Sequence, residues 1–179
     1  MGLDMYLYCN SRRVCEEVNE GSSDYEWSVP RGIAIYWRKA NAIHKWFVDN
    51  IQGGNDDCRT YQVSVEDLCR LHDTCKEVLE STRLVDAEIQ NGTINGVPNM
   101  VQGKKLEDPS KAQELLPVSS GFFFGSQGYN QYYWEDLEHT VEAVAKAIDN
   151  LEPADNLGWR VQHKDEPGWF VQFEYGSSW

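Results

Sequence analysis

Residues 32–48 constrain the fold more than any other stretch, because a strand pattern there passes directly into a helix pattern. Residues 32–37 are β-branched and aromatic, as half-buried strands usually are. Immediately afterwards, Ile43, Trp46 and Phe47 recur at the i, i+3, i+4 spacing of one helix face. Because the spacing of the apolar residues changes from that of a strand to that of a helix within a few residues, the helix is expected to pack close to the strand. We therefore expect Trp46 and Phe47 to face the core.

The same patterns recur along the chain and predict an α+β fold. Alternating or β-branched runs predict strands at residues 3–9, 59–63, 121–125, 159–163 and 169–175. Helical spacing predicts helices at residues 65–82 and 132–151 and a shorter one at 107–116. Ser64 followed by Asp67 resembles a capping box before the first of these helices. We expect a small mixed, largely antiparallel sheet with about three main helices packed on it.

The length and hydrophobic content predict one globular domain over residues 1–179. A chain of 179 residues that is 41% hydrophobic buries about 70% of the surface that its unfolded form exposes. Residues 91–103 are rich in Asn, Gly, Thr and Pro, and Asn95-Gly96 is a strong tight-turn signal. We therefore predict that residues 86–106 form a surface insertion, either a loop or a small hairpin.

The charge of the chain restricts its partners. Sixteen basic and 29 acidic residues give a formal net charge of -13. Such a charge opposes non-specific binding to nucleic acid and to anionic membranes. The imbalance is greatest in residues 107–179, which hold 13 acids and only four bases. We expect a strongly negative face there and a basic protein as its partner.

The cysteines indicate a reducing compartment and no metal. There are five, an odd number, and no apolar run near the start is long enough for a signal peptide or a membrane span. The spacing Cys69-x-x-His72-x-x-Cys75 spreads three side chains over about 120° of a helix, too wide for easy convergence on one ion. We expect free thiols in the cytoplasm, with no metal and no cofactor.

One group of residues has the composition of an anion site. Arg38, Lys39, Asn41 and His44 lie at the predicted start of a helix, where free backbone N–H groups attract phosphate or carboxylate. The alternative is that the cations pair with the many acids of the chain. Catalysis by Cys58 with His44 as its base also stays open, because such partners meet in space rather than in sequence.

A second group has the composition of a protein-binding surface. Exposed tyrosine and tryptophan beside carboxylates suit a basic partner. The candidate residues are Tyr129, Tyr132, Tyr133, Trp134, Glu135, Asp136, Glu138 and Glu142. Core packing is the alternative for most of the aromatic residues in this region.

Several blocks of sequence resemble a family of small bacteriophage and prophage proteins. These are MGLDMYL at residues 1–7, YWRKANAIHKWF at 36–47, LLP at 115–117, GFFFGS at 121–126 and YGSSW at 175–179. The resemblance brings no catalytic residues, and it implies a bacterial cytoplasm. It also raises the expectation of a non-enzymatic inhibitor of a host defence protein, such as an anti-CRISPR protein that blocks a Cas nuclease. The alternative is a small-molecule or nucleotide-binding protein, or an enzyme, centred on Arg38, Asn41 and His44.

Overall fold

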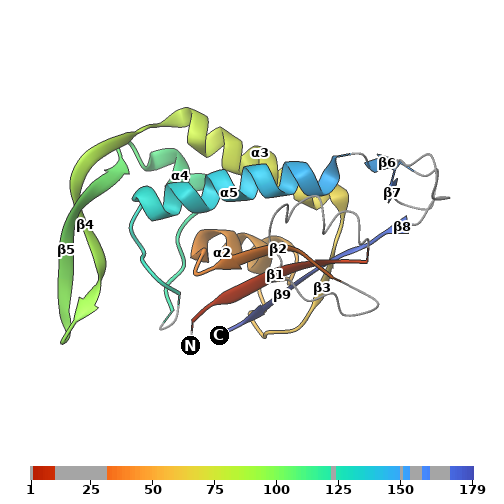
Figure 1. Cartoon of the computed structure of the whole chain (residues 1–179), viewed down its shortest axis with the longest axis horizontal. Coiled ribbons are helices and arrows are strands. Elements are labelled where there is room, and N and C mark those ends of the chain that lie inside the picture. The colour runs from red at the N-terminus through yellow and green to blue at the C-terminus, as the bar shows by residue number, and fades with distance from the viewer. Residues whose placement is uncertain (1, 11–31, 122–123, 150, 154–158, 162–169) are drawn as a thin grey trace.

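The computed structural model describes residues 2–10, 32–121, 124–149, 151–153, 159–161 and 170–179, and it confirms an α+β fold (Figure 1). Its main sheet has four antiparallel strands in the order β2-β1-β9-β3. Their bounds are Asp4–Cys9 for β1, Gly32–Arg38 for β2, Tyr61–Val63 for β3 and Phe173–Ser178 for β9. The two ends of the described chain therefore lie side by side in the sheet.

Alternation along the strands determines which face of the sheet is covered. In β1 every second residue is buried, and Met5 and Leu7 pair with Trp37 and Ile35 of β2. On the same face Tyr175 of β9 stands opposite Leu7. Successive side chains in a strand point to opposite faces, so these residues form one apolar surface. The helices pack on that surface (Figure 1).

Four helices are described, and three are longer than two turns. They are α2, Asn41–Asn50; α3, Val65–Ser81; α4, Ser110–Leu115; and α5, Gln131–Ile148. The predicted capping box is present, since Ser64 and Asp67 bond reciprocally at the start of α3. Asn130 caps α5 by accepting from the amides of Tyr132 and Tyr133. Helix α5 packs along α3 and also touches β2 and α2.

Residues 84–106 form a long hairpin that extends from the body (Figure 1). Strand β4 is Leu84–Ile94 and strand β5 is Val97–Leu106. The predicted Asn95-Gly96 turn is present, with φ of 53° and 80°, the positive values that a type I′ turn requires. The root of the hairpin is fixed, because the Leu106 amide donates to the Tyr129 carbonyl at 2.9 Å. The sequence predicted a loop or small hairpin here, and the hairpin begins two residues earlier than the predicted insertion.

The second half of the chain contains the main differences from prediction. Within residues 121–125, the described residues Gly121, Phe124 and Gly125 are not in a strand, and Gly125 has a φ of 83°. The glycines that flank this stretch therefore belong to a tight loop rather than to the ends of a strand. The predicted C-terminal pairing is present in β7, Trp159–Val161, and β8, Phe170–Val171, which join β6, Leu151–Pro153. The turn predicted at 164–168 and the loop predicted at 10–31 lie almost wholly outside the described residues.

No helix in the described part of the chain is both long enough and apolar enough to cross a membrane.

Candidate functional site

The residues predicted to bind an anion divide into two exposed cations and two buried polar side chains. Arg38 is exposed and lies 4.0 Å from the Asp4 carboxylate. Lys39 connects β2 to α2 with a φ of 61°, an uncommon value for a residue other than glycine. Asn41 and His44 are 4% and 1% exposed. The four residues are close in sequence, but only the two cations face solvent.

Asn41 holds the loop that precedes α5. Its Nδ2 donates to the carbonyls of Phe124 and Ser126 at 3.0 and 2.8 Å. Its Oδ1 accepts from the Ser119 amide at 3.0 Å. Every polar atom of the side chain therefore has a protein partner, and a ligand would have to displace one of them.

His44 is buried and lies at the centre of a hydrogen-bond network that reaches the surface at Asp56 and Trp179. Its Nδ1 is 2.7 Å from the Tyr175 hydroxyl, and its Nε2 is 3.0 Å from Asp56 Oδ2. The other oxygen of Asp56 accepts from Trp179 Nε1 at 3.0 Å. Burial raises the pKa of Tyr175 well above its usual range, so its hydroxyl stays protonated. Because both ring nitrogens of His44 are occupied, the network connects α2 to β9 and leaves no nitrogen to act as a base for Cys58.

The partners of His44 could not be found from the sequence. Tyr175 is 131 residues away, and no local pattern connects the two. Asp56 is one of two consecutive acids in a chain with 29 acidic residues, so its type carries no information. Only the folded sheet, which places β9 beside β1, brings these groups together.

The residues predicted to bind a protein partner lie in and just before α5, and they divide into residues that pack in the core and residues that face solvent. Tyr133 is buried and donates to the Leu116 carbonyl, while Trp134 and Tyr129 pack against the core. Tyr132 is 36% exposed. The exposed acids are Glu135, Glu138 and Glu142. At about 100° per residue these three carboxylates fall within about 60° of arc on α5, so they form one acidic stripe.

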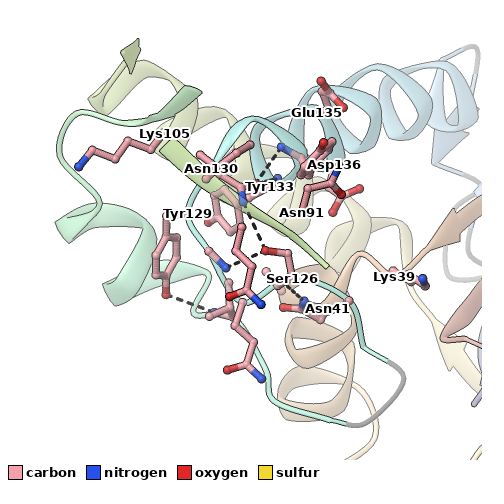
Figure 2. Close-up of a pocket in the computed structure, with 18 of the residues that line it drawn as sticks. Lys39, Asn41, Asn91, Lys105, Ser126, Tyr129, Asn130, Tyr133, Glu135 and Asp136 are labelled. Carbon is pink, nitrogen blue, oxygen red and sulfur yellow. Dashed lines mark hydrogen bonds between the residues drawn. The ribbon is translucent and has the colours of Figure 1, made fainter. Parts of the chain in front are cut away.

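A cleft lies between the hairpin and the start of α5. Its volume is about 1230 Å³. Its lining comes from the β2–α2 junction, from β4 and the end of β5, from the loop at 125–130 and from the first turns of α5. Figure 2 shows Glu135 and Asp136 on the helix above Ser126 and Asn41, with Lys105 and Lys39 at opposite sides of the view.

Asp136 differs from the other acids of α5 because it lies on the side that faces the protein. Its residue is only partly exposed, and no described cation forms an ion pair with it. Burial, together with the neighbouring Glu135, raises its pKa from 3.8 to about 7. The carboxyl thus borders the cleft without a cationic partner among the described residues.

The raised pKa predicts that Asp136→Asn stabilises the protein at high pH. The folded state binds the proton more tightly, so the wild-type protein loses stability as pH rises from about 4 through about 7. We expect the variant to match the wild-type protein at pH 4 and to exceed it at pH 8 by about 1–2 kcal/mol, a value reduced for partial exposure. Urea unfolding at both pH values measures this difference. The control is Glu138→Gln, which changes an exposed acid of the same helix; an equal pH dependence in the two variants would contradict the assignment to Asp136.

The described residues contain no group of three His, Cys, Asp or Glu side chains placed to hold a metal ion. In the Cys69-His72-Cys75 spacing, Cys75 is buried and burial raises the pKa of its thiol. His72 instead contacts the Asp73 carboxylate at 2.9 Å.

Comparisons of the chain with protein-family models, with curated proteins and with solved structures found no match. The features of the molecule that bear on its function are the acidic stripe, the cleft and the charge of the chain.

Proposed function

We propose that the protein is a non-enzymatic inhibitor that binds a basic surface of a nucleic-acid-handling protein in a bacterial host. The observation that carries the proposal is the acidic stripe of α5, formed by Glu135, Glu138 and Glu142 and continued at its start by exposed Tyr132. Of the three carboxylates only Glu142 forms a described ion pair, with Lys146 at 3.0 Å. Carboxylates at regular spacing beside a tyrosine suit the basic groove that normally holds a phosphate backbone.

The overall charge supports the same kind of partner. At a net charge of -13 the protein is attracted over long distances to basic proteins and repelled by nucleic acid. The resemblance of several sequence blocks to bacteriophage and prophage proteins supports a host protein as the target. A defence nuclease, such as the Cas nuclease that an anti-CRISPR protein blocks, combines a basic groove with that context.

The alternative of an anion or nucleotide site at Arg38, Asn41 and His44 has less support. The polar atoms of Asn41 and His44 are already bonded to protein groups. Arg38 lies near a carboxylate rather than in an uncompensated basic pocket.

The proposal predicts that reversing the acidic stripe abolishes binding. Tagged protein should capture a basic protein from bacterial lysate, and a high-salt wash should release it. The triple variant Glu135→Lys, Glu138→Lys, Glu142→Lys should weaken the purified complex about 100-fold, because three attractive contacts become repulsive. Isothermal titration with the captured partner measures the change.

A second triple variant controls for net charge. Asp73→Lys, Glu80→Lys and Glu114→Lys change exposed acids on α3 and α4 and shift the net charge by the same amount. This control should retain binding within a few-fold. Equal losses in both triple variants, or a captured partner that is acidic, would contradict a role for the acidic stripe.

A further inference from the structure

The cleft between the hairpin and α5 exposes the edge of a strand. Six consecutive residues of β4, from Glu88 to Thr93, line it. The strand register shifts between Gln90 and Thr93, but Glu88, Ile89 and Gln90 precede that shift, and successive side chains of a regular strand point to opposite faces. These three residues therefore border the cleft with the edge of β4 and not only with one face. Ile89 is the buried residue of this wall. It packs directly on Gly103 of β5, where an added Cβ atom would come within 2.5 Å of Ile89 Cδ1.

The backbone groups of Glu88 and Gln90 on this edge have no partner among the described residues. In β5 two amides donate away from β4. The Lys104 amide donates to the side-chain oxygen of Gln131, the first residue of α5, and the Leu106 amide donates to the Tyr129 carbonyl in the loop before α5. In an antiparallel ladder such residues belong to pairs that exchange no hydrogen bonds. Lys104 is paired with Asp86, and such pairs recur at every second residue, so Glu88 with Gln102 and Gln90 with Met100 are also pairs of this kind. The N–H and C=O groups of Glu88 and Gln90 therefore point outward from the hairpin. Within the described residues no backbone partner takes up these groups.

The distal part of the hairpin contains no charge. Residues 89–103 are all uncharged, although 25% of the chain is charged. Three large aliphatic side chains are exposed on it, Ile94 at 61%, Val97 at 65% and Met100 at 51%. An isolated two-stranded hairpin is only marginally stable in water, and exposed aliphatic groups favour contact with a partner.

The opposite wall of the cleft is aromatic and acidic. Tyr129 and Tyr132 line it, followed by Glu135 and Asp136 on the first turns of α5 (Figure 2). Three cations, Arg38, Lys39 and Lys105, also line the cleft, but Arg38 pairs with Asp4 and none of the three forms an ion pair with Asp136 among the described residues. A segment that enters the cleft thus meets a free strand edge on one side and an uncompensated carboxylate on the other.

We infer that the cleft binds an extended, cationic polypeptide segment of the partner, which adds a third strand beside β4 and places an Arg or Lys side chain next to Asp136. Strand addition would satisfy the outward groups of Glu88 and Gln90. The volume of about 1230 Å³ exceeds that of most small-molecule sites. This inference rests on the proposed function for the basic character of the partner. The cleft shares Tyr132 and Glu135 with the surface of the acidic stripe, but it adds the edge of β4 and Asp136 and therefore a separate mode of recognition.

A synthetic peptide tests the cleft without the natural partner. The probe is a blocked peptide of about ten residues that alternates arginine and valine, so that all its cations lie on one face of a strand. Titrated into ¹⁵N-labelled protein, it should shift the amide signals of β4 and of Asp136, and it should slow hydrogen exchange at Glu88 and Gln90. The same peptide with glutamate in place of arginine should not bind.

Two proline variants give a matched test of strand addition. Gln90→Pro removes an outward N–H on the cleft side, and Gln102→Pro removes one on the opposite edge of the hairpin. Neither N–H belongs to the β4–β5 ladder, so both variants should keep the hairpin. Gln90→Pro and Asp136→Asn should each weaken probe binding about tenfold, whereas Gln102→Pro should leave it unchanged.

The outcomes separate this inference from the proposed function. Probe shifts confined to Glu138 and Glu142, no binding at all, or equal effects of the two proline variants would each overturn the cleft site. The partner could still depend on the acidic stripe, and the proposed function would then stand alone. If the probe binds the cleft but no basic protein is captured from lysate, the cleft site stands and the proposed function falls.

Discussion

Replacing Phe47 with alanine is expected to destabilise the protein by about 3–5 kcal/mol, the usual cost of a cavity left by a buried aromatic side chain. Phe47 has no exposed surface. Its ring stacks on that of Tyr175, with 3.8 Å between centroids and 6° between planes. Trp37 and Trp46 pack on it at 5.9 and 5.3 Å. The side chain thus connects α2 to two strands of the sheet, and its loss removes contacts in all of these elements.

Urea unfolding followed by circular dichroism measures this cost, with Val48→Ala as the control. Val48 is the next residue of the same helix and is only partly buried, so its truncation should cost about 1 kcal/mol or less. A loss for Phe47→Ala no larger than that for Val48→Ala would show that the stacked pair is not central to the core.

The sequence was sufficient to predict most of the local elements, although Gly121, Phe124 and Gly125 were predicted in a strand and are not in one. Ile43, Trp46 and Phe47 lie on one buried face of α2, as expected because their i, i+3, i+4 spacing matches the 3.6 residues per turn of an α-helix. The start of α3 was predictable from Ser64 and Asp67, since a capping box is a contact between residues three apart. The turn at Asn95-Gly96 was predictable because positive φ values favour these residue types.

The sequence was not sufficient to predict how distant segments combine. The hairpin prediction near the C-terminus did not show that β9 is an inner strand between β1 and β3, because strand order depends on contacts across the whole chain. The same limit applies to the surface on α5. Eight residues were grouped by composition, but only the helix phase separates exposed Tyr132 and Glu138 from buried Tyr133 and inward Asp136.

The cleft was missed for a related reason. Its two walls are more than twenty residues apart in sequence, and one of them is an unpaired strand edge, which leaves no sequence pattern of its own. The uncharged run at 89–103 was the available signal. This uncharged run indicates a hairpin tip that could contact a partner, but it does not indicate which part of the chain lies opposite the tip.

Replacing Asn41 with alanine is expected to cost about 2–4 kcal/mol and to release the loop before α5. The substitution removes three hydrogen bonds, one buried and two partly buried, and leaves the carbonyls of Phe124 and Ser126 without their donor. Ser126 and the residues after it line the cleft, so the same variant should also weaken binding of the arginine-valine probe. Urea unfolding measures the stability, and hydrogen exchange at the Ser119 amide reports the loop directly.

Asn50→Ala is the matched control for Asn41→Ala because it removes an asparagine from the same helix. Asn50 donates a single bond, to the Trp46 carbonyl at 2.8 Å, from an exposed position. Its loss should cost less than about 1 kcal/mol and leave exchange at Ser119 unchanged. Asn41→Ala should accelerate that exchange well beyond the change in global stability, because the amide loses its own acceptor. Equal exchange in the two variants would mean that the loop is held by its packing, with the Asn41 amide contributing little.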